Sequence, residues 1–364
     1  MAGAKTTTME KVKAYGTSAP TADLELIAID RRDLEAKDVE IDILYCGVCH
    51  SDIHMARSEW GPAKYPVVPG HEIIGKVSHV GPEVKKYKVG DIVGVGCMVD
   101  SCGECDSCKE GLEQYCEHGP IMTYGGNDLH LGGHTYGGYS EKIIVDEDFV
   151  LSIPANLDLK KVAPLLCAGI TTWSPLRHWG VKAGDKVGVI GLGGLGHMGI
   201  KLAHAMGAYV VMITTSPNKA EDAMLLGADE VLISKDPEAM QLHARSFDFL
   251  LNTIPVGHDT NPYISLLKRD KTMVLVGAIE PLKAVHGGLL IRSRVTIAGS
   301  VIGGIKETQE MLDFCGKYNI TPEIEMISIQ DINRAFDRVV KADVKYRFVI
   351  DMKSLNQNLS GDGN

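Results

Sequence analysis

The sequence predicts an α/β protein of about two domains, one an irregular β-rich domain and the other a doubly wound domain with a parallel sheet. The chain has 364 residues, of which 45% are hydrophobic, which is enough for two cores at roughly 150 residues per domain. Short alternating apolar runs broken by Gly and Pro occupy residues 11–153. From about residue 186, longer apolar runs alternate with helical segments.

In the first region the strand candidates are residues 39–45, 73–77, 91–95 and 139–145, each bounded by turn-forming residues. In the second region they are residues 186–190, 209–213, 230–233, 248–251, 272–276 and 295–298. Strands that alternate with helices in this way indicate a six-stranded parallel sheet with helices on both faces. A helix over about 306–318 and a strand over 346–350 are expected to return to the first domain. We therefore expect one domain from residues 1–158 and 303–364 and another from residues 159–302.

The net charge of −10 at pH 7 disfavours partners that carry phosphate backbones or anionic headgroups. No stretch approaches the ~20 apolar residues of a membrane helix, and the first fifteen residues lack the apolar segment of a secretory signal. We expect a soluble cytoplasmic protein that binds neither nucleic acid nor membranes. Its nine cysteines are then expected to be reduced and available to metals.

Four of these cysteines lie close together in the sequence, at Cys102, Cys105, Cys108 and Cys116. Four thiolates at such spacing satisfy one tetrahedral zinc ion with no open coordination position. The lobe over about 97–120 is therefore predicted to hold a structural zinc.

A looser set of metal-binding residue types surrounds this lobe: Cys49, His71, Glu72 and Cys167. A Cys/His/Cys set beside a closed site predicts a second zinc that keeps one position free for substrate. Each residue alone is more often a buried thiol or a core histidine. Cys46-Gly-Val-Cys49 also matches a CxxC redox pair, although no thioredoxin-like unit surrounds it. The set as a whole favours the metal site over these alternatives.

A glycine-rich loop follows the strand candidate at residues 186–190 and opens a helical run over residues 195–206. Its residues Gly191, Gly193, Gly194, Leu195 and Gly196 would let the backbone approach a pyrophosphate at a helix N-terminus. A purely structural turn is the alternative. The position between a strand and a helix favours dinucleotide binding.

The end of the next strand candidate indicates which dinucleotide binds. NAD-binding folds carry an acidic residue about 20 residues after the loop, for the ribose 2′-hydroxyl. Here the segment instead contains Thr214, Thr215, Ser216 and Lys219, and no acid occurs before Glu221. Hydroxyls and a lysine favour a 2′-phosphate, so NADP(H) is the expected cofactor. The hydroxyls could also cap the helix that follows, and one residue can serve both purposes.

Together these motifs resemble the zinc-dependent part of the medium-chain dehydrogenase/reductase superfamily. The pattern Gly70-His71-Glu72-x2-Gly75-x5-Gly81-x2-Val84 is similar to its zinc-alcohol-dehydrogenase signature. The four-cysteine lobe, the glycine-rich loop and the closing Lys345-Tyr-Arg347-Phe-Val resemble the cinnamyl alcohol dehydrogenase-like branch and its bacterial aldehyde-reductase relatives. The resemblance implies a GroES-like catalytic domain, an inserted Rossmann domain, a substrate cleft between them and a homodimer paired through the cofactor domain.

The resemblance also implies roles for the matched residues. The implied ligands of the catalytic zinc are Cys49, His71 and Cys167, with Glu72 as an alternative ligand, so that each subunit holds two zinc ions. Asp52 is implied to orient His71. A proton relay is implied for Ser51 and His54, and contacts with the cofactor for His50, Thr171 and Arg347.

The implied reaction is hydride transfer between NADP(H) and primary alcohols or aldehydes, with aldehyde reduction as the expected direction. Met122 stands where plant cinnamyl enzymes place an aromatic residue, and its flexible side chain suits a broad range of aromatic and aliphatic aldehydes. The pocket candidates, each of which could equally be ordinary core, are Trp60, Met98, Met122 and Ile302. Three other functions stay open: a zinc-free double-bond reductase, a zinc-retaining one that usually replaces the hydroxyl of Ser51, and a non-catalytic NADPH-binding protein.

Overall fold

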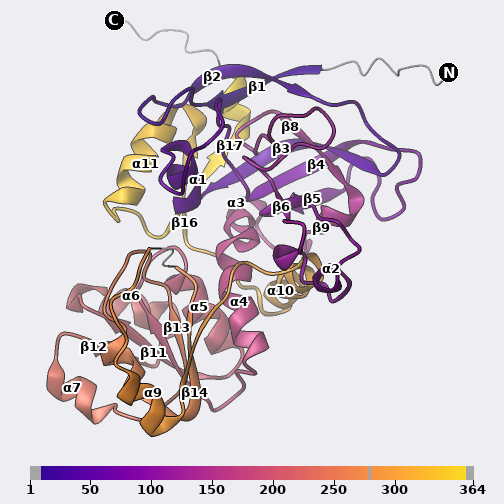
Figure 1. The fold of residues 1–364 in the computed structure, drawn as a ribbon. Coiled ribbons are helices and arrows are strands. Elements are labelled where there is room, and N and C mark those ends of the chain that lie inside the picture. Colours follow the sequence, from indigo (N-terminus) through magenta and orange to yellow (C-terminus); the bar gives the residue numbers. More distant parts are fainter. Residues whose placement is uncertain (1–9, 278–279, 358–364) are drawn as a thin grey trace, which may run out of the picture. The chain divides into compact units, whose positions relative to one another are not determined.

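The computed structural model describes residues 10–277 and 280–357. The chain divides into two compact units, one formed by Met1–Cys167 with Gly304–Asn364 and the other by Ala168–Gly303. Figure 1 shows the C-terminal elements in yellow among the indigo and purple elements of the first unit. The first division falls after Cys167 rather than after residue 158, because α3 (Leu159–Val162) and the 3₁₀ helix η3 (Ala163–Leu166) contact strands of the first unit.

The first unit is built on a seven-stranded sheet. Its strands follow the order β16-β17-β3-β4-β5-β9, and β8 also pairs with β3. Neighbours are antiparallel, except that β16 and β17 run parallel. The strands are β3 (Asp38–Val48), β4 (Ile73–Val80), β5 (Ile92–Val95), β8 (Lys142–Asp146), β9 (Leu151–Ser152), β16 (Ile324–Ser328) and β17 (Arg347–Asp351). The pairing of β17 with β3 brings Arg347, from the end of the chain, beside the segment that carries Cys49.

Two smaller antiparallel pairs complete the β-structure of this unit. They are β1 (Glu10–Gly16) with β2 (Glu25–Arg31), and β6 (Met98–Asp100) with β7 (Ile121–Met122).

The strands predicted at residues 39–45, 73–77 and 91–95 are confirmed as β3, β4 and β5. The strand predicted at residues 139–145 begins only at Lys142, because Tyr139 has other partners. Its N–H donates to the Pro69 carbonyl at 3.0 Å, and its own carbonyl accepts from the Tyr15 N–H at 2.8 Å. Tyr139 therefore lies against the segment that leads into His71.

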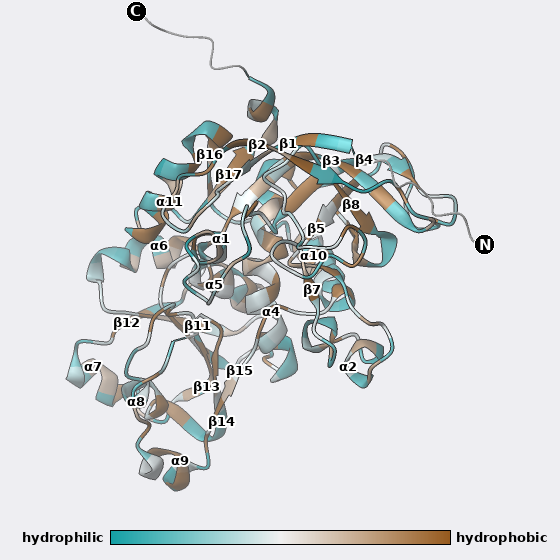
Figure 2. Cartoon of the chain, turned by 45° about the horizontal axis from the view of Figure 1, so that its top comes forward, coloured by the Kyte–Doolittle hydropathy of each residue, from teal (hydrophilic) through white to brown (hydrophobic). Residues whose placement is uncertain are grey.

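The helices of the first unit are short except for two near the C-terminus. They are α1 (His50–Ala56), α2 (Asp106–Lys109), α3, α10 (Ile305–Tyr318) and α11 (Ile332–Val340), with 3₁₀ helices η1 (Glu113–Tyr115), η2 (Glu147–Phe149), η3, η5 (Ile329–Asp331) and η6 (Met352–Asn356). The helix predicted over 306–318 is confirmed as α10. α11 buries Ile332, Ala335 and Phe336, and Figure 2 shows hydrophilic and hydrophobic residues along it.

The second unit contains a six-stranded sheet in the order β12-β11-β10-β13-β14-β15, and every pair is parallel. The strands are β10 (Lys186–Ile190), β11 (Tyr209–Thr214), β12 (Glu230–Ile233), β13 (Phe247–Asn252), β14 (Leu267–Leu275) and β15 (Thr296–Gly299). All six predicted strands are thus confirmed. The chain runs outward from β10 and then crosses back to β13, which makes the carboxyl end of β10 the switch point where doubly wound sheets bind ligands.

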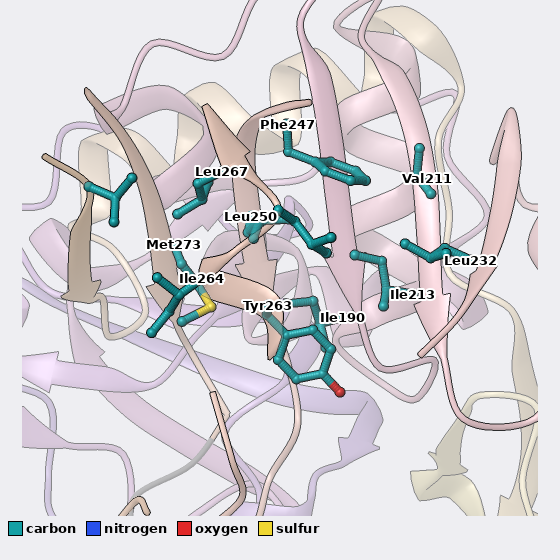
Figure 3. Packing of buried hydrophobic residues seen from close by; sticks show 12 residues of the cluster. Ile190, Val211, Ile213, Leu232, Phe247, Leu250, Tyr263, Ile264, Leu267 and Met273 are labelled. Carbon is teal, nitrogen blue, oxygen red and sulfur yellow. The ribbon is translucent and has the colours of Figure 1, made fainter. Parts of the chain in front are cut away.

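Helices connect the strands of this sheet. They are α4 (Ala168–His178), α5 (Gly196–Ala205), α6 (Ala220–Leu225), α7 (Pro237–Leu242), α8 (Asn261–Ile264) and α9 (Gly287–Ser293), with the 3₁₀ helix η4 (Pro217–Lys219). Figure 3 shows part of the core of this unit, where Phe247, Leu250 and Met273 of the sheet pack with Tyr263 and Ile264 of α8.

Within residues 10–277 and 280–357, no helix combines the length and the apolar character that crossing a membrane would require.

Candidate functional site

Four side chains of the first unit converge at one point. The ligand atoms of Cys49, His71, Glu72 and Cys167 all lie within 4.8 Å of one another. The Sγ atoms of Cys49 and Cys167 are 3.9 Å apart. All four residues are buried, and Glu72 is fully so. The structure therefore brings together the complete second metal set that the sequence predicts.

The sheet positions these residues. Cys49 directly follows β3, and Glu72 directly precedes β4, its antiparallel neighbour. The Gly47 N–H donates to the Glu72 carbonyl at 2.9 Å, which holds the two strand ends together. Cys167 ends η3, which contacts β3, β4 and β5. Backbone pairing of β3 with β4 thus brings Cys49 and Glu72 to the same place.

Asp52 orients the imidazole of His71. Its Oδ1 lies 3.2 Å from His71 Nδ1, and its Oδ2 accepts from the Cys49 N–H at 2.8 Å. Because Nδ1 faces Asp52, Nε2 is left to face the cluster. A carboxylate behind a ligating histidine is the usual arrangement at metal sites.

Glu72 has two carboxylate oxygens in different surroundings. Oε1 is paired with Arg347, which is 5% exposed, whereas Oε2 is buried with no hydrogen-bond partner among the described residues. Burial raises the pKa of Glu72 to about 7, although the charge of Arg347 opposes this. Burial also acts to lower the pKa of Arg347, but the charges of Glu72, Cys49 and Cys167 together outweigh it and the pKa is raised.

The donor set fits a zinc ion. Two thiols, an imidazole and a carboxylate are ligands that zinc takes. The Oε2 atom of Glu72 has no hydrogen-bond partner among the described residues, and a cation would supply one.

The two thiols of the set differ in their pKa values. A hydrogen bond from Cys167 lowers the pKa of Cys49 well below its usual value, against the effect of burial. The pKa of Cys167 is raised, first by its hydrogen bond with Cys49. The pair therefore holds one thiolate readily.

Helix α1 places polar side chains beside this cluster. The Ser51 hydroxyl lies 3.5 Å from Cys49 Sγ. The imidazole of His54 stacks on His50 at 4.7 Å between ring centroids and on Trp60 at 4.9 Å. Its Nδ1 is 2.5 Å from a carboxylate oxygen of Glu59. The sequence analysis did not identify Glu59 as a partner of His54. The only signal in the sequence is that an acidic residue follows His54 by a few positions.

The four-cysteine set also forms a cluster, with all ligand atoms within 4.8 Å of one another. Cys102 and Cys108 are 3.9 Å apart at Sγ. Backbone N–H groups donate to two of the sulfurs, from Cys105 to Cys102 at 3.4 Å and from Glu117 to Cys105 at 3.5 Å. Such donors stabilise thiolates, so this cluster also fits a zinc ion.

The CxxC alternative does not fit the geometry. Cys46 Sγ contacts the Gly47 carbonyl and packs closely against Gly70 and Gly138, where an added Cβ would collide with it. Cys49 Sγ instead faces Cys167. Burial raises the pKa of Cys46 well above its usual value, which makes it a poor nucleophile. Cys97 is also buried, and its thiol contacts the Leu166 carbonyl.

In the second unit, the glycine-rich loop leaves room for a ligand. Gly191 has a φ of +95°, and a Cβ at Gly196 would collide with the Gly191 carbonyl, so both positions require glycine. A Cβ at Gly193 would meet nothing within 4 Å. The backbone there is open, as a loop that receives a pyrophosphate must be. Gly194 and Leu195 complete the loop before α5.

The segment after β11 lies next to this loop. Lys219 Nζ donates to the Leu192 carbonyl at 3.0 Å. Thr214 is buried and accepts from the Ser216 N–H at 3.1 Å, while Thr215 is exposed. Ser216 precedes η4 without capping it by its side chain. The capping alternative therefore does not account for the Ser216 hydroxyl.

The four pocket candidates are distributed over both units, three in the first and one in the second. Met98 and Met122 pair opposite each other in β6 and β7, with Met98 buried and Met122 37% exposed. Trp60 is exposed and stacks on His54. Ile302 belongs to the second unit, as does Thr171, which is buried in α4.

Comparison with known proteins places this geometry in a family. Residues 35–155 match the alcohol dehydrogenase GroES-like domain, and residues 194–317 match the zinc-binding dehydrogenase domain. The chain is 55% identical to aldehyde reductase YahK of Escherichia coli (strain K12), with 95% of this chain and 99% of the relative covered. It is 53% identical to NADP-dependent alcohol dehydrogenase C 1 of Mycolicibacterium smegmatis over the same shares of the two chains.

Among solved structures, the CAD from Helicobacter pylori complexed with NADP(H) superposes with a TM-score of 0.89 at 43% identity, covering 95% of this chain and 99% of that one. The expected GroES-like and Rossmann domains are confirmed by these matches. The chain belongs to the zinc-binding alcohol dehydrogenases of the medium-chain dehydrogenase/reductase superfamily.

Proposed function

We propose that this protein is a zinc-dependent oxidoreductase that transfers hydride between NADP(H) and alcohols or aldehydes, with aldehyde reduction as its main direction. The observation that carries the proposal is the buried cluster of Cys49, His71, Glu72 and Cys167, with Asp52 behind His71. The names of its relatives, an aldehyde reductase and an NADP-dependent alcohol dehydrogenase, support the same chemistry.

The residues take separate roles. Cys49, His71 and Cys167 would hold a catalytic zinc, and Glu72 would be an alternative ligand. The four-cysteine set would hold a second, structural zinc. When bound, zinc supplies Lewis acidity at a substrate oxygen, and the nicotinamide supplies or accepts a hydride. The protein itself must bind the substrate beside Cys49 and supply or accept the proton that is transferred in the reaction.

Proton transfer falls to helix α1. In aldehyde reduction the Ser51 hydroxyl would donate a proton to the product oxygen. His54 lies three residues further along the helix, on the same face, and would return the proton to Ser51. Glu59, in contact with His54 Nδ1, would orient the imidazole for this transfer.

The cofactor would bind in the second unit, with its pyrophosphate at the glycine-rich loop and its 2′-phosphate beside Thr215, Ser216 and Lys219. The ammonium of Lys219 and the lack of an acidic side chain before Glu221 favour NADP(H) over NAD(H), because a carboxylate would repel the phosphate. We also assign His50, Thr171 and Arg347 to contacts with the cofactor.

The two units would act as a catalytic domain and a cofactor domain. We further propose a homodimer paired through β15. This strand forms one edge of the sheet among the described residues, and the nearby Ile291 and Val301 are 83% and 49% exposed. Light scattering should give twice the chain mass of 39.4 kDa, and a monomer would rule out the pairing.

Metal analysis combined with an aldehyde screen tests the main proposal. We expect two zinc ions per chain, faster oxidation of NADPH than of NADH, and alcohols as products from both aliphatic and aromatic aldehydes. An α,β-unsaturated aldehyde in the panel separates carbonyl reduction from double-bond reduction by its product. Cys167→Ser should lose one zinc and the activity. An active wild-type protein with a single zinc, confined to the four-cysteine set, would overturn the proposal.

A further inference from the structure

We propose that Tyr139 is a positioning residue for the catalytic metal site, acting through Asp52 on His71, with Tyr124 supporting the same imidazole. This inference rests on the proposed catalytic zinc. It assigns a function to two buried phenol groups that the reaction itself does not use.

The Tyr139 hydroxyl completes a set of donors around Asp52. Asp52 is fully buried. Its Oδ2 accepts from the Tyr139 hydroxyl at 3.1 Å and from the Cys49 N–H at 2.8 Å, and its Oδ1 accepts from the Gly70 N–H at 3.1 Å. These three donors fix the plane of the carboxylate. The fourth contact of the carboxylate is the one between Oδ1 and His71 Nδ1. The three hydrogen bonds above set the direction of this contact.

Tyr139 is itself held rigidly. Its side chain is fully buried, and its ring fills the space that the glycine at position 70 leaves open, since a Cβ there would lie 2.7 Å from Tyr139 Cδ1. Gly70 has a φ of +104°, so glycine is required on conformational grounds as well. The ring therefore packs directly on the residue before His71.

A buried arginine fixes the loop that carries Tyr139. Arg31 is 8% exposed and donates to the Gly137 carbonyl at 2.9 Å and to the Ser140 hydroxyl at 2.8 Å. The Gly138 N–H also donates to the Gly70 carbonyl at 2.8 Å. The loop is thus tied both to β2 through Arg31 and to the segment before His71.

Tyr124 supports the imidazole from a second direction. Its hydroxyl lies 3.1 Å from His71 Nδ1, and the two rings are 5.4 Å apart between centroids. Tyr124 is 7% exposed. His71 Nδ1 therefore faces both Asp52 and a phenol, and the ring has little freedom to rotate away from the cluster.

The role of the hydroxyl differs from that of an ordinary core side chain. Tyr139→Phe keeps the ring and its packing but removes one donor from Asp52, so the imidazole should be held less firmly. Loss of a group behind a metal ligand typically reduces metal affinity by about 10- to 100-fold. If Tyr139 were an ordinary core residue, loss of its hydroxyl should change only the folding stability of the protein and not its metal affinity.

Cadmium substitution gives a direct readout. In wild-type protein loaded with ¹¹³Cd, we expect two NMR resonances, one from the four-cysteine set and one from the set with His71. Tyr139→Phe should shift the second resonance and leave the first in place. Tyr139→Phe should also speed zinc release to a chromophoric chelator about 10-fold. The change should occur in the kinetic phase of the proposed catalytic zinc, which is identified by its absence from Cys167→Ser. Tyr124→Phe should act in the same direction.

Tyr87→Phe is the matched control. Tyr87 is a half-buried tyrosine of the first unit, and its hydroxyl also donates to a partner within this unit, the Val150 carbonyl, at 2.7 Å. This variant should leave both resonances and the release rate unchanged. If Tyr139→Phe changes only thermal stability, as Tyr87→Phe does, the positioning role is wrong even though two metals bind. If the wild type shows only the four-cysteine resonance, the proposed catalytic zinc itself is wrong.

Discussion

Lys219 Nζ donates to the carbonyl oxygen of Leu192 at 3.0 Å, which ties the segment after β11 to the glycine-rich loop. A positive charge therefore lies beside the backbone that we expect to receive the cofactor. Lys219 is the last residue of η4, and its N–H donates to the Ser216 carbonyl at 3.2 Å. The residue therefore contacts both the glycine-rich loop and the segment that carries Ser216.

We predict that Lys219→Ala weakens NADPH binding and hardly affects NADH. A charge-assisted hydrogen bond contributes about 1.5–3 kcal/mol, so the KM for NADPH should rise by roughly 10- to 100-fold while kcat stays close to the wild-type value. Steady-state kinetics with both cofactors measure this. Lys235→Ala, at an exposed lysine of the same unit, should change neither constant. An equal loss with NADH would contradict recognition of the 2′-phosphate by Lys219.

Ser51→Ala should slow aldehyde reduction by about 10²- to 10⁴-fold, the usual contribution of a positioned proton donor. Its hydroxyl is beside Cys49 Sγ, and no other hydroxyl occurs in α1. Ser51→Thr retains a hydroxyl and should keep most of the activity. Single-turnover rates with NADPH provide the measurement, and zinc content must be equal in the three proteins. Full activity in Ser51→Ala would show that the proton comes from elsewhere.

Cys108→Ala should remove the structural zinc and destabilise the protein. The lobe contacts the start of α10, since the Ile305 N–H donates to Glu113 at 3.0 Å, so its disorder would reach beyond the loop. A loss of about 3 kcal/mol would lower the melting temperature by roughly 6–12 °C at this domain size. Calorimetry and metal analysis should show a lower midpoint and one zinc fewer. The pH dependence of kcat should be unchanged in the protein that remains folded, because the proposed reaction does not involve the lobe. Loss of both zinc ions would contradict two independent sites.

The sequence predicts the doubly wound sheet well because local pattern determines it. Each strand is an apolar run, each connection is helical, and the residue bounds of β10 and β12 match the expectation. Helix α1 was not predicted, since it has seven residues and its first turn is stabilised by Asp52 bonding back to the Cys49 N–H. Such short helices depend on their caps and tertiary contacts rather than on periodicity.

The metal cluster was predicted because several metal-binding residue types occur in one chain and because the motifs resemble those of a known family. The sequence spacing of these residues did not predict it. Cys49 and Cys167 are 118 positions apart, and Arg347 is 275 positions from Glu72. No local pattern encodes such contacts. Tyr139 illustrates the same limit, because its place behind Asp52 follows from Gly70 and Arg31, which are distant in sequence. Residues that orient the ligands therefore appear only in the fold.

A final prediction concerns how the cofactor-binding unit responds to acid. Asp248, at the start of β13, links three strands: it accepts from the Lys186 N–H of β10 at 3.0 Å and from Lys268 Nζ of β14 at 2.7 Å. Burial acts to raise the pKa of Asp248, but the hydrogen bonds and the lysine charges outweigh it, so that its pKa lies below the usual value. A depressed pKa means that the folded state favours the carboxylate. The stabilisation is therefore complete above about pH 4, the ordinary value for Asp, and is lost as pH falls through the lower pKa of the folded state.

Asp248→Asn should thus reduce the stability of this unit by about 1–2 kcal/mol at pH 7, by the same amount at pH 5, and by progressively less below about pH 4. Acid would also release the zinc ions proposed for the first unit, so global unfolding would mix two effects. Amide hydrogen exchange at Leu250 and Leu251, buried in β13, reports on the cofactor-binding unit directly. Glu238→Gln, at an exposed position in α7, should leave the exchange rates unchanged. A stability difference that grew as the pH fell from 5 to 3 would reverse the assigned sign, because the carboxylate would then stabilise the protein most when protonated.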